Sequence, residues 1–187
     1  MSLNKIFWIQ LLLSLIIGQQ QAGTAWGEVR TWVDATGKFI VTAELVEVRG
    51  DKVVLQKQNG KQITVPVAKL SAKDQKFLNL VEHTAQAEAE LEKGRLFFEK
   101  QDWDTAIACF TEAIRLNPSY AEAYFSRGLA CNVKGDYDKS IADYTQAYVN
   151  RGYVYHETRD FDKSIADYTQ AIRLNPNDAK ANFSRAV

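Results

Sequence analysis

The chain repeats itself, and this internal similarity constrains its fold more than any other feature. Residues 138–147 (DKSIADYTQA) recur without change as residues 162–171. The phrase at residues 113–118 (AIRLNP) recurs as residues 171–176, and the interval from Gly94 to Gly128 equals that from Gly152 to Ala186. A fixed period of this length is typical of helix pairs that stack on one another, because a lone pair cannot bury its apolar face.

The pattern within each period resembles the tetratricopeptide repeat. The first copy matches that family in order at Gly94, Phe97, Ala106, Phe110, Ala113 and Pro118. The resemblance implies an α-solenoid over residues 85–187, with repeats at 85–120, a shortened 121–147, 148–178 and a partial 179–187. Its packing positions are then Gly94, Ala106, Ala113, Pro118, Gly128, Ala147, Gly152, Ala171 and Pro176.

The local chemistry agrees with helix pairs. A glycine at a helix crossing lets two backbones approach closely, and bulky partner residues fill the space beside it. Asn117-Pro118 and Asn175-Pro176 end the second helix of each pair, since proline disfavours helix at the residue before it. Turns within the pairs are predicted at Gln101-Asp102, Gly135-Asp136 and Arg159-Asp160.

One repeat is shortened, because the interval from Gly128 to Gly152 is ten positions smaller than that from Gly94 to Gly128. The omitted residues include the proline that separates one repeat from the next. Between residues 137 and 158 only Gly152 disfavours helix, by about 1 kcal/mol relative to alanine. We therefore predict one fused helix of about 20 residues. It is either a device that redirects the solenoid or a recombination scar between near-identical repeats.

Residues 28–81 show short β-rich runs separated by turn dipeptides. Asn59-Gly60 predicts a type I′ hairpin turn, in which both central residues have positive φ. Pro66 lacks an amide hydrogen and is expected at a strand end or a sheet edge. Ser71 is expected to begin a helix, with Asp74 completing a partial capping box.

A change of phase is visible inside the second β-rich run. Phe39, Val41, Ala43 and Leu45 alternate with polar residues, whereas Val46 and Val48 continue in the opposite phase. Such a slip indicates a β-bulge or a bend, as closing a small barrel requires. Trp32 and Phe39 are interpreted as core residues rather than as a ligand platform.

This segment resembles the first Sla-one homology domain. The matching phrases are Arg30-Thr-Trp-x-Asp34, Thr36-Gly-Lys-Phe39, Ala43-Glu44, Val54-x-Leu-x-Lys57, Asn59-Gly-Lys61, Val65-Pro66 and Lys69-Leu-Ser71 with Asp74. The resemblance implies a small SH3-like β-barrel, which in endocytic adaptors binds Asn-Pro-Phe-x-Asp peptides. It implies a peptide-binding fold more directly than it implies that ligand. The fold class expected for the whole chain is α+β with two domains, the barrel at 28–81 and the solenoid at 85–187.

The first 25 residues are predicted to be a signal peptide. Lys5 and the amino terminus give a basic start, residues 6–17 are almost wholly apolar, and small residues follow at 22–25. As a helix, the apolar run reaches about 18 Å, short of the ~30 Å hydrocarbon core of a bilayer. We expect cleavage and an exported protein, periplasmic or secreted, that does not associate with a membrane afterwards. The alternative is an uncleaved anchor.

Composition and side-chain chemistry exclude several functions. Lys+Arg and Asp+Glu both number 23, which gives no reason to expect a nucleic-acid partner. His83 and His156 have no carboxylate or thiol cluster at metal spacing, so no metal, cofactor or catalytic residue is predicted. Export would permit a disulfide between Cys109 and Cys131, but their positions favour two buried thiols.

The tetratricopeptide resemblance also implies an inner groove, formed mainly by the first helix of each pair. The matching residues are Leu91, Arg95, Phe98, Phe125, Leu129, Val133, Val149 and Tyr153. This set is mostly apolar, and it lacks the Lys and Asn residues with which some repeat proteins clamp a terminal carboxylate. It predicts a groove for an extended or helical peptide with apolar anchors. The alternative is that neighbouring helices cover some of these side chains.

The sequence therefore predicts an exported, non-enzymatic interaction module or scaffold. Its partner is expected to be a protein or peptide held by the repeat groove, and the β domain is a candidate site for another partner. The competing interpretation is a truncated or degenerate repeat protein without a ligand, since residues 179–187 hold only the start of another pair.

Overall fold

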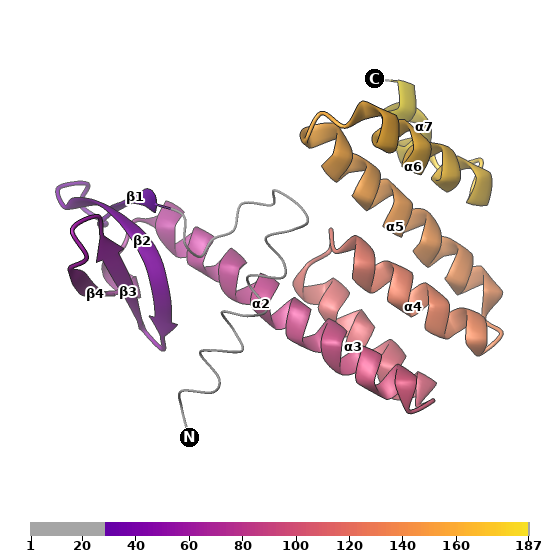
Figure 1. Cartoon of the computed structure of the whole chain (residues 1–187), viewed down its shortest axis with the longest axis horizontal. Helices are drawn as coiled ribbons and strands as arrows, with labels where there is room; N and C mark the ends of the chain where they lie inside the picture. Colours follow the sequence, from indigo (N-terminus) through magenta and orange to yellow (C-terminus); the bar gives the residue numbers. More distant parts are fainter. Residues whose placement is uncertain (1–28, 187) are drawn as a thin grey trace. The chain divides into compact units, whose positions relative to one another are not determined.

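The computed structural model describes residues 29–186, and it divides into two compact units, the first ending at Val81 and the second beginning at Glu82 (Figure 1). The predicted signal peptide, residues 1–25, lies outside the described residues. Within residues 29–186, none of the helices combines the length and the apolar composition that a bilayer crossing needs.

The first unit contains an antiparallel sheet whose strands pair in chain order. The strands are β1 (Val29–Val33), β2 (Ile40–Arg49), β3 (Lys52–Lys57) and β4 (Gln62–Pro66), followed by the short 3-10 helix η1 (Val67–Lys69). The α+β class is confirmed. Pro66 is the last residue of the edge strand β4, as predicted.

The barrel expected from the resemblance is not closed. Among the described residues, β1 and β4 share no ladder, and only an isolated bridge between Asp34 and Leu70 joins the ends of the sheet. At the end of β1, one backbone N–H of the outer edge is taken by a side chain of the helix that follows the sheet. The Val33 N–H donates to Asp74 Oδ2 at 2.8 Å, and the Val33 carbonyl accepts from the Ser71 N–H at 2.7 Å. The bond from Ser71 belongs to the Asp34–Leu70 bridge itself, whereas the bond to Asp74 takes an N–H that a longer ladder would need.

The predicted bulge is found in β2. Leu45 is paired with Leu55 and Glu47 with Val54, so Val46 is the extra residue. Because successive strand residues point to opposite faces, the extra residue resets the phase. Val48 consequently packs against the same core as Val41 and Leu45.

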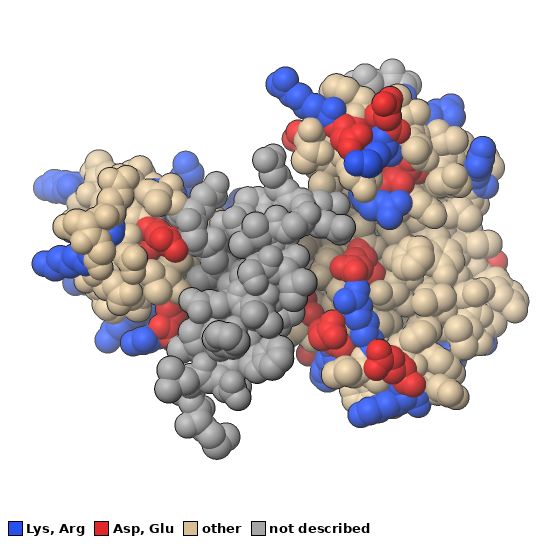
Figure 2. All heavy atoms as spheres, in the orientation of Figure 1, with Lys and Arg blue, Asp and Glu red and all other residues tan. Residues whose placement is uncertain are grey.

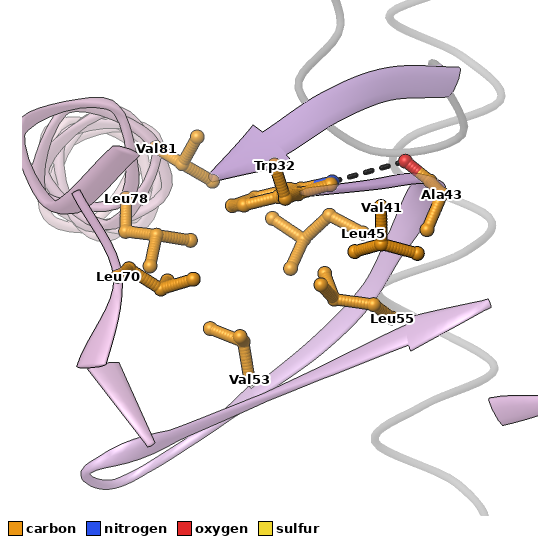
Figure 3. Close-up of a cluster of buried hydrophobic side chains, with 9 residues drawn as sticks. All are labelled: Trp32, Val41, Ala43, Leu45, Val53, Leu55, Leu70, Leu78 and Val81. Carbon is orange, nitrogen blue, oxygen red and sulfur yellow. Dashed lines mark hydrogen bonds between the residues drawn. The ribbon is translucent and has the colours of Figure 1, made fainter. Parts of the chain in front are cut away.

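The core of the first unit is built around Trp32 (Figure 3). This side chain is fully buried, and its indole N–H donates to the Ala43 carbonyl at 3.0 Å. Leu78 and Val81, from the helix after the sheet, complete the cluster. The prediction that Phe39 belongs to this core is wrong, since Phe39 is exposed where β2 begins.

Two local predictions have different outcomes. The turn at Asn59-Gly60 has positive φ only at Gly60, so it is not the type I′ turn predicted. Its bonds, Gly60 N–H to the Lys57 carbonyl and Lys57 N–H to the Lys61 carbonyl, fit the three-residue loop with a glycine bulge. The partial capping box is found: Ser71 Oγ accepts from the Asp74 N–H, while the Ser71 N–H donates to the Val33 carbonyl.

The second unit is formed by helices in sequence. They are α2 (Ala72–Glu99), which begins in the first unit, α3 (Trp103–Leu116), α4 (Ala121–Val133), α5 (Tyr137–Glu157), α6 (Phe161–Leu174) and α7 (Ala179–Ala186). The turns predicted within pairs are found. Gln101, Gly135 and Arg159 each have positive φ. The aspartate after each caps the next helix, at Asp102, Asp136 and Asp160.

The fused helix predicted from the ten-residue omission is also found. α5 is continuous over 21 residues, from Tyr137 to Glu157. Its first half packs against α4 and its second half against α6. α5 is thus the second helix of one pair and the first helix of the next.

Hydrogen exchange tests the continuity of α5. We expect the amides of residues 144–150 to exchange slowly and as one group, because each donates within an unbroken helix whose centre is buried. The measurement is native-state exchange followed by mass spectrometry or NMR. Rapid exchange confined to these residues would contradict the continuous helix.

Candidate functional site

Close helix crossings fix the geometry of the second unit, which begins at Glu82 and which we call the repeat unit. A Cβ placed on Gly94 would lie 2.5 Å from the Phe110 ring. At Gly128 it would lie 3.1 Å from the Tyr144 ring, and at Gly152 it would lie 3.0 Å from the Tyr168 ring. In each case a glycine on the first helix of a pair faces an aromatic ring on the second. The bare glycine allows the two helices to approach each other.

An ion pair between a buried aspartate and a partly exposed arginine accompanies two of these crossings. The Arg127 guanidinium binds both oxygens of Asp143 at 2.8 Å, and Arg151 binds Asp167 at 2.7 and 2.8 Å. Both aspartates are buried, and bidentate pairing satisfies their carboxylates. The bond to Asp143 raises the pKa of Arg127. Sequence analysis missed these pairs, although Arg-Gly is followed by Asp-Tyr at the same interval in both copies.

The remaining small residues predicted to pack lie inside the unit or at helix ends. Ala106, Ala113 and Ala171 are fully buried, and Ala147 is nearly so at the centre of α5. Pro118 and Pro176 each follow directly after the asparagine that ends α3 or α6.

Three of the predicted groove residues form an exposed line on α4. Phe125, Leu129 and Val133 are 46%, 37% and 50% exposed, and their spacing of four residues keeps them on one helix face. Phe125 rests on the Tyr144 ring, with centroids 5.1 Å apart. We call these three residues the α4 apolar row. Figure 2 shows charged side chains gathered in places on the surface of the repeat unit, with uncharged surface between them.

The other predicted groove residues are not equivalent to the α4 apolar row. Leu91 and Val149 are 2% and 1% exposed and belong to packed clusters, as the covering alternative anticipates. Phe98 is partly buried against Trp103, with ring centroids 4.7 Å apart. Tyr153 on α5 is exposed. Arg95 is half-buried and engaged by carboxylates.

Those carboxylates form a cluster that sequence analysis did not identify. Arg95 pairs with Glu122 on α4 and with Glu92 on its own helix, the latter at 3.3 Å. Glu88 lies one turn before Glu92. Burial raises the pKa of the Tyr120 phenol, and the charges of Glu122 and Glu88 raise it further. The phenol therefore lies within electrostatic reach of carboxylates from both helices, and we call Glu88, Glu92 and Glu122 the carboxylate cluster.

A second set of exposed apolar residues is found where α5 and α6 begin. Tyr137 and Ile141 are exposed on α5, as are the equivalent Phe161 and Ile165 on α6. On α3, Ile107 holds the same repeat position and packs into the core that α4 completes. The fused helix explains the difference on α5. Its second half continues in line and does not fold back to cover the first.

The remaining reactive side chains are unremarkable in the described part of the chain. Cys109 and Cys131 are free and buried, and burial raises the pKa of both thiols, which keeps them in the unreactive protonated form. His156 stacks edge-on against Phe161, and His83 is exposed. Within residues 29–186, His, Cys, Asp and Glu side chains do not gather in threes that could hold a metal ion.

Comparison with family models identifies both halves of the chain. Residues 20–86 match the SLA1 homology domain 1. Residues 91–155 and 145–178 match tetratricopeptide repeats. The two repeat matches overlap over residues 145–155, inside α5, which agrees with one helix serving two repeats. The chain thus carries a segment of the first type followed by tetratricopeptide repeats.

Two curated relatives illustrate the similarity. The actin cytoskeleton-regulatory complex protein sla1 of Schizosaccharomyces pombe is 46% identical over 54 residues, which are 29% of this chain and 4% of that protein. The chain thus spans only a small part of the sla1 proteins. Protein MJ0572 of Methanocaldococcus jannaschii is 36% identical over 59 residues, 32% of this chain and 69% of that protein. The chain belongs to the same family as this archaeal protein.

Similar solved structures are tetratricopeptide domains. The Arabidopsis OM64 TPR domain superposes with a TM-score of 0.34 at 24% identity, covering 56% of this chain and 94% of that domain. The first TPR of Spaghetti (RPAP3), bound to the HSP90 peptide SRMEEVD, gives a TM-score of 0.34 at 22% identity. This second match covers 55% of this chain and 90% of that one.

A pair of leucine substitutions tests which predicted groove residues are structural. We expect Leu91→Ala to lower the free energy of unfolding by about 2–4 kcal/mol, because it leaves a cavity in a packed cluster. Leu129→Ala, on the exposed α4 apolar row, should cost less than about 1 kcal/mol. Urea unfolding followed by circular dichroism measures both. Equal losses would show that the two leucines do not differ in role.

Proposed function

We propose that this protein is a non-catalytic module that binds a polypeptide segment along the α4 apolar row. The observation that carries the proposal is the exposure of Phe125, Leu129 and Val133 in one line on a helix whose opposite side is packed. Such a row resembles the anchor surface of helix-in-groove recognition, in which side chains spaced along one face fill apolar contacts.

Tyr153 adds an exposed aromatic side chain on the second half of α5. A few side chains supply most of the binding energy at protein interfaces, and aromatic side chains are enriched among them. An apolar ligand segment is therefore expected to depend chiefly on Phe125 and Leu129.

The packing of the repeats favours a working module over a degenerate remnant. Each buried side-chain nitrogen or oxygen in residues 29–186 has a hydrogen-bond partner. The bidentate ion pair is built alike in both copies, from Arg127 to Asp143 and from Arg151 to Asp167. A chain released from selection would be expected to lose such arrangements, since a buried charge is costly once its partner is lost.

A paired variant tests the proposed surface. We expect Phe125→Ala with Leu129→Ala to weaken binding of partner polypeptides at least about tenfold, since two anchors are lost. The matched control is Phe161→Ala with Ile165→Ala, which removes exposed side chains of similar size from α6. Partners are recovered from an exported-protein fraction and their affinities measured with the purified chain. Equal affinity of both variants for every partner would refute the assignment.

Export remains part of the proposal. Its support is the order of basic start, apolar residues 6–17 and small residues 22–25. We expect the protein isolated from its native source to begin near residue 26 and to be found outside the cytoplasm. Amino-terminal sequencing and cell fractionation measure this. A chain that retains Met1 in the cytoplasmic fraction would contradict export.

A further inference from the structure

The α4 apolar row has a distinct chemistry at one end. Glu122 lies three residues before Phe125, so a carboxylate and the three apolar side chains follow one another along the same face of α4. From Glu122 to Val133 this face extends about 16 Å. A ligand that lies along it therefore meets a charged end and an apolar end, and the two ends differ in what they attract.

The charged end is acidic. Two of its carboxylates, Glu92 of α2 and Glu122 of α4, share the Arg95 guanidinium, and Glu88 lies one turn before Glu92 on α2. Three carboxylates against one guanidinium leave an excess of negative charge. Glu88 is half-buried, and within the described residues no hydrogen bond or ion pair joins its carboxylate to another side chain.

Arg95 is already paired with two carboxylates of the cluster. Its guanidinium already donates to Glu122 and to Glu92. A carboxylate brought to this end would meet a guanidinium whose charge these two partners already balance, and it would face their negative charge. A cationic group would instead meet Glu88, whose carboxylate is not paired with any side chain of the described residues. Opposite charges several ångströms apart attract measurably at a partly buried surface.

We propose that the segment bound along the α4 apolar row is basic at one end, with Lys or Arg placed against the carboxylate cluster and two or three apolar side chains against the row. This inference rests on the proposed function and specifies its ligand. It predicts a defined direction for the bound segment, with the cation toward Glu122 and the apolar residues toward Val133. It also predicts that a segment ending in acidic residues is rejected.

Selection from a random peptide library tests the proposal. The full chain is immobilised, and displayed peptides of about twelve residues are used, long enough to follow the face even as a helix. We expect the selected peptides to contain Lys or Arg at one end and large apolar residues beyond it, with Asp and Glu depleted. Synthetic versions should bind at least about tenfold more tightly than copies with Glu in place of Lys or Arg. This preference should decrease at high salt, because the charges are partly exposed.

Two variants separate the possible outcomes. Glu88→Gln with Glu92→Gln should reduce the preference for basic peptides while the apolar preference persists, because the row is unchanged. Phe125→Ala with Leu129→Ala should abolish enrichment of all peptides. Apolar peptides enriched without a charge preference, or with acidic residues, would overturn this inference and leave the proposed function standing. No enrichment relative to the Phe125→Ala, Leu129→Ala variant would overturn both.

Discussion

The repeat unit depends on the close crossing at Gly152, where the second half of α5 meets Tyr168 and Asp167. The same contact is made one shortened repeat earlier, where Gly128 meets Tyr144 and Asp143. Since Tyr144 and Gly152 are on one helix, α5 must satisfy two crossings at once. The small Ala147, buried between them, lets the helix do so without a break. A shorter or longer spacing would rotate one crossing away from its partner.

The exposed surfaces of the unit follow from this arrangement. The first pair consists of α2 and α3. The next helix, α4, packs on α3 and helps to bury Ile107. The second pair consists of α4 and α5. Because α5 continues in line, Ile141 stays exposed, and no other helix of residues 29–186 covers it. The α4 apolar row has a different origin, because it follows the regular repeat pattern at the positions of a predicted groove. The omitted residues therefore account for the exposure of Ile141, while the regular repeat pattern accounts for the α4 apolar row.

Much of the fold could be predicted from the sequence, because local residue patterns determine local structure. The repeats, the fused helix and the bulge at Val46 follow from spacing and phase alone. Barrel closure could not be predicted, because it depends on which groups form hydrogen bonds with the outward-facing backbone N–H and carbonyl groups of β1. The Asp74 carboxylate accepts from the Val33 N–H here, and the sequence pattern assigns Asp74 only to a helix cap. Likewise the groove residues shared one repeat pattern, but Val149 is buried in a cluster with Tyr168 and Ala171 of α6 and Ala181 of α7. The carboxylate cluster joins residues from α2 and α4, which no single period brings together.

α2 begins as the capped helix of the first unit and ends as the first helix of the repeats. Leu78 and Val81 belong to the core around Trp32, and Leu91, about three turns later, belongs to the core around Phe110. The family matches end at residue 86 and resume at residue 91, both inside this helix. Any gene fragment cut there severs a helix rather than a linker. Fragments that share all of residues 72–99 would keep each half intact, so the two halves are best expressed with overlapping ends.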